Sequence, residues 1–486
     1  MTASGRRGPG NPDGVPRSVG RGPGNPRGVP RSVGAGPAVA GRPAGRRATV
    51  AAGVRDVALA ALARVDDGAW ANLTLPALLA RSGLGDADRA AVTDLVYGSL
   101  RLRGALDHAL RPLSRQPLER LEPLVLRGLR LGAYELLFAR TAAHAAVAET
   151  VGAVTRAGRR GQAGYVNAVL RRLAATPPAW PDPAADPAAW ATTRGSHPAW
   201  VVEEALARLG PDGLVALVEA DNARPAVTLR ATPGRAGRDE LLAELAAAGS
   251  PASAHPLSPD CLVLERGDPA ALPAVRDGRA VVQDAASALV APAVGAAPGD
   301  LVVDLAAGPG GKAGHLAALG ARVLAVERHP GRARMVHQAA RRLGVAERLH
   351  AVVGDGRRPP LRQGGADAAL VDAPCSNLGS LRRRPEARWR HRPEEIPGLV
   401  ALQLELLAAA ADAVRPGGVV VYSVCTWTRA ETDEVVDELR RRRPELVPAP
   451  DAGGLTGPAG RRQLWPHLDG GDGVFLARLR KTADAR

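Results

Sequence analysis

Between residues 296 and 486, short apolar stretches of strand length alternate with longer stretches of helical periodicity. Strands that alternate with helices of about 10–15 residues are typical of a doubly wound α/β fold with a largely parallel sheet. We expect strands at Leu301–Leu305, Arg322–Glu327, Leu349–Val353, Ala368–Asp372 and Gly418–Val424. In such folds ligands bind beyond the carboxyl ends of the strands, so functional side chains are expected there.

The chain before this α/β domain divides into regions of different composition. Residues 49–175 show apolar residues at i, i+3 and i+4 with no alternating pattern, which predicts an all-α domain. Residues 176–295 are expected to hold a linker, rich in Pro, Ala and Trp over 174–197, and a small α+β domain. In that small domain we expect helices at Trp200–Leu209 and Arg238–Ala248, and strands at Ala226–Arg230 and Cys261–Glu265.

Residues 1–48 form a basic tail with a tandem repeat, Arg7–Gly20 and Arg21–Gly34. Two copies rich in Gly and Pro cannot build a packed core, so we expect the tail to be disordered. Its nine arginines against one aspartate supply +8 of the chain's formal charge of +15. Two interpretations stay open: electrostatic affinity for nucleic acid, or an inert extension.

Three cysteines in 486 residues, with no C-x-x-C pair, exclude a disulfide framework and argue against a structural zinc site or other bound metal. No run of 18 apolar residues predicts a membrane span, and the N-terminus has no apolar core of a secretory signal. We therefore expect a cytoplasmic protein that does not engage membranes.

A glycine-rich loop, Ala306–Lys312 (AAGPGGK), follows the first predicted strand. Glycines let the backbone approach a ligand closely and present N–H groups at a helix start. A Walker A loop is excluded, because positions 306 and 313 are both Ala. Gly308, Gly310 and Ala313 do satisfy the dinucleotide pattern G-x-G-x-x-(G/A). On this loop alone, a nicotinamide enzyme, a methyltransferase and a plain tight turn all remain open.

Two acidic residues end the next strands. Glu327 follows Gly308 by 19 residues and suits the two ribose hydroxyls of either cofactor class. Asp355, in a Gly-Asp-Gly turn after the third strand, either accepts from an adenine amino group or starts a turn, and by itself it favours the turn.

Two cysteines fall at the ends of adjacent predicted strands, whereas Cys261 is expected to be a small buried hydrophobe. Cys375 follows Asp372 by three residues, and Cys425 ends the fifth strand. Thr428-x-x-Glu431 matches a capping box, which predicts a helix starting just after Cys425, with a positive end that favours thiolate.

A nucleophilic thiolate beside a methyl donor has a known use in covalent catalysis. Its addition to carbon 6 of a pyrimidine makes carbon 5 nucleophilic enough to attack an electrophilic methyl group. An acid must protonate the base edge, and Asp372 is placed for this role. A base then removes the proton from carbon 5, and the sulfur leaves.

An arginine-rich segment, Leu381–Arg392, lies between the two cysteines. Arginines with an embedded tryptophan suit phosphate contacts and base stacking, and the expected position at the ligand edge favours this over a solvated basic loop. The candidate RNA-binding residues are Arg382, Arg383, Arg384, Arg388, Trp389 and Arg390.

Several motifs in order resemble the RsmB-type branch of the Sun/Nop family of RNA 5-methylcytosine methyltransferases: DLAAGPGGKAGHL, DAPCSNLGSLRRRPEARWR, YSVCT and PHLDGGDGVFLARL. The all-α region is similar to NusB through LVYGSLR, LRLGAYELLF, AHAAVAETV and GYVNAVLRR. The likeness spans about residues 50 to 482. Val424 and Asn377 depart from the Thr and Gly that the family usually has there.

The resemblance implies a Rossmann-like methyltransferase domain over 296–486, S-adenosylmethionine as cofactor, and small-subunit (16S) ribosomal RNA as the partner of a monomeric enzyme. It implies that Cys425 is the nucleophile and that Cys375 helps release the product. The implied cofactor-binding residues are Ala306, Ala307, Gly308, Pro309, Gly310, Gly311, Lys312, Glu327, Asp355 and Asp372.

Two other functions remain to be weighed. A nicotinamide-dependent oxidoreductase fits the glycine loop and Glu327 but leaves Cys375, Cys425 and the arginine segment unexplained. A non-catalytic RNA-binding or antitermination-like protein fits the helical domain, and it predicts that Cys425→Ala leaves function intact.

Overall fold

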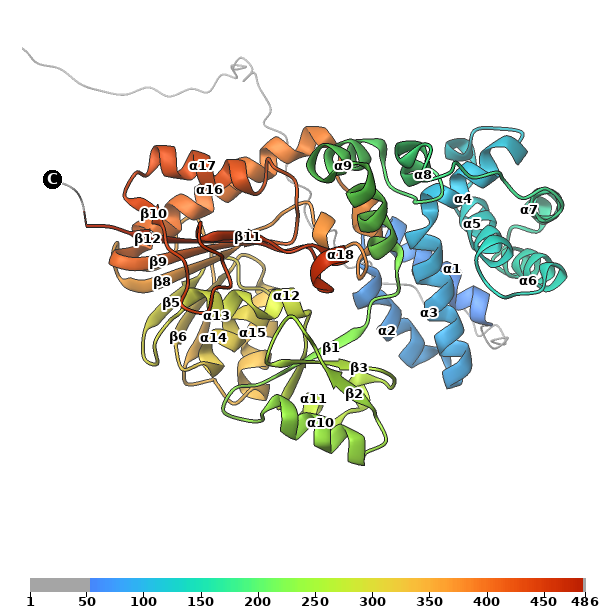
Figure 1. The fold of residues 1–486 in the computed structure, drawn as a ribbon. Helices are drawn as coiled ribbons and strands as arrows, with labels where there is room; N and C mark the ends of the chain where they lie inside the picture. The colour runs from blue at the N-terminus through green and yellow to red at the C-terminus, as the bar shows by residue number, and fades with distance from the viewer. Residues whose placement is uncertain (1–52, 484–486) are drawn as a thin grey trace, which may run out of the picture. The chain divides into compact units, whose positions relative to one another are not determined.

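Amphipathic helices form the first part of the computed structural model, which describes residues 53–483 (Figure 1). The basic tail over residues 1–48, expected to be disordered, lies outside the described residues. Aliphatic side chains from one face of each helix, such as Leu62, Leu106 and Leu129, share one buried core. The helices are α1 (Val54–Asp66), α2 (Ala71–Ser82), α3 (Asp86–Arg101), α4 (Arg103–Leu110), α5 (Pro123–Leu137), α6 (Ala143–Arg156) and α7 (Arg160–Ala175).

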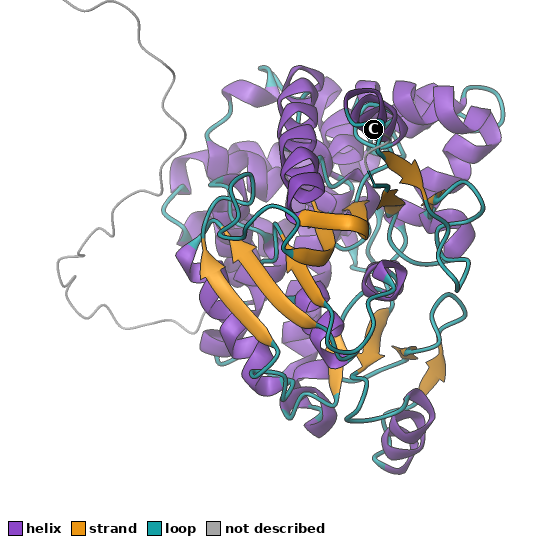
Figure 2. Cartoon of the chain, turned by 90° about the vertical axis from the view of Figure 1, so that its left-hand side faces the viewer, coloured by secondary structure: helices purple, strands orange, loops and turns teal. Residues whose placement is uncertain are grey.

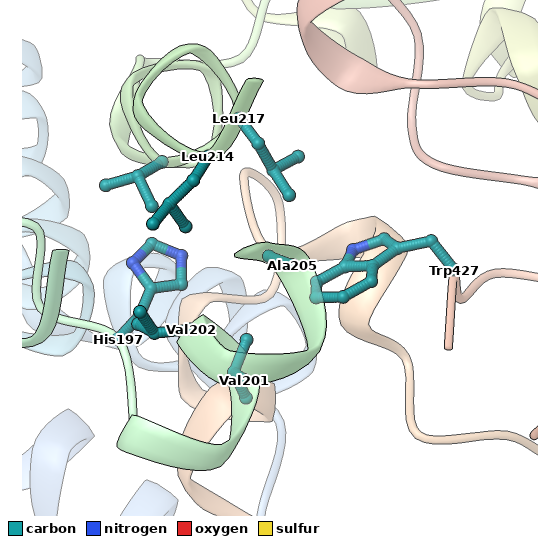
Figure 3. A pocket seen from close by; sticks show the side chains of 8 residues that line it. His197, Val201, Val202, Ala205, Leu214, Leu217 and Trp427 are labelled. Atoms are coloured by element: carbon teal, nitrogen blue, oxygen red, sulfur yellow. The ribbon is translucent and has the colours of Figure 1, made fainter. Parts of the chain in front are cut away.

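The stretch expected to be a linker contains a short helix, α8 (Pro187–Thr192), and ends in buried residues, Ser196 and His197. Helix α9 (Ala199–Asn222) is longer than the predicted Trp200–Leu209, and it kinks at Gly210, whose φ of 71° lies in the left-handed region. Apolar side chains from the two halves of α9 pack together beside Trp427, as Figure 3 shows. Helix α9 therefore supports the segment that directly follows Cys425.

A small antiparallel sheet follows, with strand order β2-β3-β1-β4. Its strands are β1 (Val227–Ala231), β2 (Ala252–Ala254), β3 (Cys261–Leu264) and β4 (Ala280–Val282), with helices α10 (Arg238–Ala247) and α11 (Pro273–Arg276). Cys261 has no exposed surface in this sheet, as expected for a buried hydrophobe, and burial raises the pKa of its thiol to about 11.

The large sheet has the order β10-β12-β9-β8-β5-β6-β7, with β11 paired to β12. Strands β5 to β9 pair in parallel, and β12 runs antiparallel to β9. The predicted strands are present as β5 (Leu301–Asp304), β6 (Arg322–Glu327), β7 (Leu349–Val353), β8 (Ala366–Asp372) and β9 (Val414–Val424); β10 (Leu446–Pro448), β11 (Arg461–Gln463) and β12 (Phe475–Lys481) complete the sheet.

Helices cover both faces of this sheet (Figures 1 and 2). Val302 of β5 packs in the core shared with α14 and α15, whereas its neighbour Val303 packs in the core shared with α16 and α17. The sheet is thus doubly wound, as predicted. The helices are α12 (Ala285–Ala288), α13 (Val290–Val294), α14 (Gly311–Ala318), α15 (Pro330–Arg342), α16 (Ile396–Ala413), α17 (Asp433–Arg442) and α18 (Pro466–Asp469).

Among the described residues, one segment, Pro393–Ala413, is long and apolar enough by composition to cross a membrane, with a mean hydropathy of 1.4. Its residues Leu406, Leu407 and Ala410 are buried in the core that also holds residues of β8 and β9. The apolar character of α16 is therefore used inside the α/β domain.

Candidate functional site

A cleft of about 1120 Å³ opens at the carboxyl ends of β5, β6, β7, β8 and β9. The strand order reverses between β5 and β8, because the chain proceeds from β5 through β6 to β7 on one side and from β8 to β9 on the other. Ligands in doubly wound folds bind at such a point. The cleft is lined by the glycine loop, Glu327, Asp355, Asp372 and both candidate cysteines, Cys375 and Cys425.

The glycine loop packs tightly against the end of β6. The backbone N–H of Gly308 donates to Oε2 of Glu327 at 3.0 Å. A Cβ atom on Gly308 would lie 2.2 Å from that same oxygen, so a larger residue does not fit. Gly310 adopts a φ of 104°, which favours glycine, and α14 begins at the next residue. The chain thus turns from β5 into α14 through this loop, and the loop backbone leaves room for a ligand.

Glu327 and Asp355 are both held by neighbouring groups. The second carboxylate oxygen of Glu327 accepts from the backbone N–H of His329 at 2.8 Å, and the side chain is 5% exposed. Asp355 accepts from the backbone N–H and the guanidinium of Arg357, which lower its pKa to about 2. Asp355 therefore stabilises a local turn while it also lines the cleft.

Asp304, at the end of β5, is a cleft residue to which the sequence analysis gave no role. It is 1% exposed, and burial together with the charge of Asp372 raises its pKa to about 7. Nearby, Nζ of Lys312 lies 2.6 Å from Oδ2 of Asp372. Although burial alone would lower the pKa of Lys312, the adjacent Asp372 raises it above its usual value. The sequence held one signal for Asp304 as a cleft residue, namely that it is an acidic residue at the end of the central strand, β5.

The two cysteines meet as their adjacent strands predicted. Asp372 of β8 pairs in register with Ser423 of β9, and the Sγ atoms of Cys375 and Cys425 lie 3.4 Å apart. Cys375 is 5% exposed, whereas Cys425 is half-buried and faces the cleft. The hydrogen bond between the thiols raises the pKa of Cys375 and lowers that of Cys425. Cys425 is thus the thiol that ionises more readily.

The predicted helix start just after Cys425 is wrong. Helix α17 begins at Asp433, because Glu431 turns inward and accepts from the backbone N–H and hydroxyl of Ser376 instead of capping a first turn. Thr428 and Glu431 do hydrogen-bond to one another. The lowered pKa of Cys425 comes from the hydrogen bond with Cys375, helped by nearby cations, rather than from a helix end.

The structure also corrects the expected RNA contact of Arg388. Its side chain has no exposed surface, and its guanidinium donates to the backbone carbonyls of Arg101 and Ser196 and to Oδ1 of Asn222, each at 3.0 Å. Burial lowers its pKa to about 10. Arg388 therefore connects α3 and α9 to the segment between the cysteines, and it is not available to a phosphate.

Arg382 and Arg383 are also engaged within the protein. Arg383 bridges the carboxylates of Asp284 and Asp472, at 2.7 and 3.2 Å. Burial and the negative charge of Asp284 together raise the pKa of Asp472 to about 7. Arg382 donates to the carbonyl of Gly470 at 2.7 Å.

The other candidates surround two tryptophans. The guanidinium of Arg390 lies 3.8 Å from the ring centroid of Trp70, and that of Arg384 lies 5.4 Å from it. Trp389 is partly buried beside Arg103, whose guanidinium is 5.5 Å from its ring. Trp70 and Arg384 both line the cleft.

No group of three or more His, Cys, Asp or Glu side chains within residues 53–483 is arranged to hold a metal ion.

Family models match three consecutive parts of the chain. The NusB family model matches residues 52–175, and the model of the ferredoxin-like domain of RsmF/B-like methyltransferases matches residues 197–270. The 16S rRNA methyltransferase RsmB/F model matches residues 292–480, which contain the cleft loops.

Similar proteins extend over most of the sequence. A putative methyltransferase of Mycobacterium tuberculosis is 44% identical over 437 residues, covering 85% of this chain and 93% of that protein. The probable ribosomal RNA small subunit methyltransferase B of Bacillus subtilis is 33% identical, covering 88% and 98%. The solved structure of PH0851 has the same fold, with a TM-score of 0.77 at 23% identity, covering 90% of this chain and all of that one. The chain therefore belongs to the RsmB/F family of 16S rRNA methyltransferases, and not to the oxidoreductases or non-catalytic RNA-binding proteins that parts of its sequence allowed.

Proposed function

We propose that this protein transfers a methyl group from S-adenosylmethionine to carbon 5 of a cytosine in 16S rRNA, through a covalent bond between Cys425 and the base. The observation that carries the proposal is the pair of sulfur atoms, 3.4 Å apart, in the cleft that also contains the glycine loop and Glu327. We expect it to act as a monomer in the cytoplasm.

The residues of the cleft fit S-adenosylmethionine. Glu327 presents a carboxylate that can accept from ribose hydroxyls, and Asp355 lies in the cleft as a candidate partner of the adenine amino group. Two cleft glycines pack so closely against their neighbours that no side chain fits: Gly308 lies against the carboxylate of Glu327, and a Cβ atom on Gly356 would lie 2.0 Å from the carbonyl oxygen of Leu305. When bound, the cofactor supplies an electrophilic methyl group.

Cys425 and the Lys312–Asp372 pair perform the steps on the base. The Cys425 thiolate forms a bond to carbon 6, while the Lys312–Asp372 pair gives a proton to ring nitrogen 3. The cofactor would supply the methyl group to carbon 5 and leave as S-adenosylhomocysteine. A base then takes the proton from carbon 5, and the bond between carbon 6 and the Cys425 sulfur breaks as nitrogen 3 returns its proton. Cys375, whose Sγ lies 3.4 Å away, donates a hydrogen bond to the departing sulfur.

The RNA must present the target base out of its stack, since thiolate attack needs the ring edge. Trp70 and the flanking Arg384 and Arg390 supply an aromatic surface and positive charge near the cleft for the strand that carries the base. Arg382, Arg383 and Trp389 contribute mainly by holding this segment in place.

Cys425→Ala tests the proposal directly. Tritium transfer from labelled S-adenosylmethionine to 16S rRNA should fall to background, because the bond to carbon 6 can no longer form at residue 425, while cofactor and RNA still bind. Cys261→Ala, which alters a cysteine of the small sheet, is the matched control and should retain activity. Normal turnover by Cys425→Ala would contradict the covalent route.

Cys375→Ala tests the release step. Loss of its hydrogen bond to the leaving sulfur should slow cleavage of the carbon–sulfur bond, so a covalent enzyme–RNA adduct should accumulate on a denaturing gel. Adding Cys425→Ala to the same chain should remove that band. Normal release by Cys375→Ala, with no adduct, would contradict this role.

A further inference from the structure

Glu431 is a fully buried carboxylate in the turn between β9 and α17. Its oxygens accept from the N–H and hydroxyl of Ser376 at 2.9 and 2.6 Å, the amide of Gln403 at 3.1 Å, and the hydroxyls of Thr428 and Thr426 at 2.9 and 3.4 Å. Every one of these partners is uncharged, so none of them cancels the negative charge of Glu431.

These hydrogen bonds hold the two cysteine segments together. Ser376 directly follows Cys375 and Thr426 directly follows Cys425, and their hydroxyl oxygens lie 2.8 Å apart. Gln403 of α16, besides its bond to Glu431, donates to the carbonyl of Pro374 at 3.0 Å. Glu431 is therefore the common acceptor for both strand ends that position the sulfur atoms.

The charges around the two thiols differ. The titratable groups that face Cys375 are Cys425, Glu431 and the buried phenol of Tyr422. Those that face Cys425 are Cys375, Asp372, Arg384 and Lys312. Arg384 and Lys312 therefore favour a thiolate at residue 425 and Asp372 opposes it, whereas the carboxylate of Glu431 opposes one at residue 375.

We propose that Glu431 is a positioning residue that makes the two thiols unequal: its buried negative charge keeps the proton on Cys375, so that the pair ionises at Cys425, which faces the cleft. The inference rests on the proposed function, in which Cys425 attacks the base. The raised pKa of Cys375, caused chiefly by its hydrogen bond to Cys425 and by burial, and further by Glu431, has the direction that this requires.

Glu431→Gln keeps the size of the side chain and removes its charge. The full-length protein, without RNA or S-adenosylmethionine, is treated with iodoacetamide across a pH series, and each cysteine peptide is quantified by mass spectrometry. In the wild type, Cys425 should react at lower pH than Cys375. In Glu431→Gln, the midpoint for Cys375 should fall by about one pH unit, giving about tenfold faster alkylation at neutral pH.

Two controls separate charge from shape. Glu434→Gln removes an exposed carboxylate from α17 and should change neither midpoint. Ser376→Ala removes the 2.6 Å hydrogen bond but keeps the charge of Glu431, so Cys375 should still react after Cys425. A reversed order in Ser376→Ala would show that the hydrogen bonds, and not the charge, set the difference.

An unchanged midpoint for Cys375 in folded Glu431→Gln would overturn the inference. If that variant does not fold, the wild type and Ser376→Ala decide, since Cys375 reacting first in either contradicts the proposal. The measurement needs no methyl transfer, so it is independent of the Cys425→Ala activity test. If the covalent route fails, Cys425 can still be alkylated at lower pH than Cys375. If the two cysteines are alkylated at the same pH, methyl transfer is still not excluded.

Discussion

The ammonium group of Lys312 lies 2.6 Å from the carboxylate of Asp372. This ion pair links the half of the sheet formed by β5, β6 and β7 to the half that begins with β8 and β9. Lys312 lies in the first turn of α14, the helix after β5, and Asp372 ends β8. Because Lys312 also faces Cys425, one cation is shared between the proposed acid and the proposed nucleophile. This arrangement makes the ionisation of Cys425 depend on Lys312.

Lys312→Met should therefore raise the pH at which Cys425 is alkylated by about one unit, since a cation that favours the thiolate is lost. Methyl transfer should fall at least about tenfold, because the proton donor pair is also broken. The pH dependence of iodoacetamide labelling, read by mass spectrometry, checks the first effect. Lys481→Met, which removes a lysine bound to the carbonyls of Ala411 and Val414, should leave that midpoint unchanged.

Gly308→Ala should weaken binding of S-adenosylmethionine by about tenfold or more, equivalent to about 1.4 kcal/mol. The added Cβ atom would lie 2.2 Å from Oε2 of Glu327, so the loop or the carboxylate must move. Titration calorimetry with the cofactor measures the change. Gly331→Ala in α15 has no atom within 4 Å of the new Cβ and should bind normally, so equal affinities for the two variants would contradict the role of the loop.

Asp304→Asn should change how stability depends on pH. Since the pKa of Asp304 rises from 3.8 to about 7 on folding, its contribution is fully present below pH 3.8 and is lost as pH rises through about 7. The Asn variant has no such loss, so its free energy of unfolding relative to that of the wild type should rise by about 2–4 kcal/mol between pH 4 and pH 8. Urea unfolding at both pH values measures this.

Asp239→Asn is the control for the Asp304 experiment, because that side chain is 85% exposed. Its effect on stability should be near zero at both pH values. If Asp304→Asn behaves in the same way as Asp239→Asn, the carboxyl of Asp304 is ionised in the folded protein at both pH values.

Arg388→Met should destabilise the fold by about 1–3 kcal/mol, because the carbonyls of Arg101 and Ser196 and the amide oxygen of Asn222 lose their donor. Since Arg388 is buried, the salt dependence of RNA binding should not change. Arg392→Met, at an exposed position, should not affect unfolding. A stable Arg388→Met protein with a weaker salt dependence would restore the original expectation of a phosphate contact.

Local patterns predicted the elements that hold continuous apolar runs. Strands β6 and β7 have the predicted bounds, because each is a short, mostly apolar run of strand length. Strand β12, in contrast, was not predicted: Phe475–Lys481 carries Arg478 and Arg480 among its apolar residues, and it forms a strand by pairing with β9 some 50 residues earlier. Its strand character depends on a partner that is distant in the sequence.

The sequence by itself determined the order of the main predicted elements, the glycine loop, and the placement of Cys375 and Cys425 at the ends of successive strands, because strand periodicity and strand ends are local properties. Only the tertiary structure decided which charges surround each thiol. Glu431 resembles a helix cap in sequence, and Arg388 resembles a solvated cation, yet both are buried and bound to groups far along the chain or on another strand end. A buried polar group is stable only where its partners converge, and that convergence is a property of the packed fold.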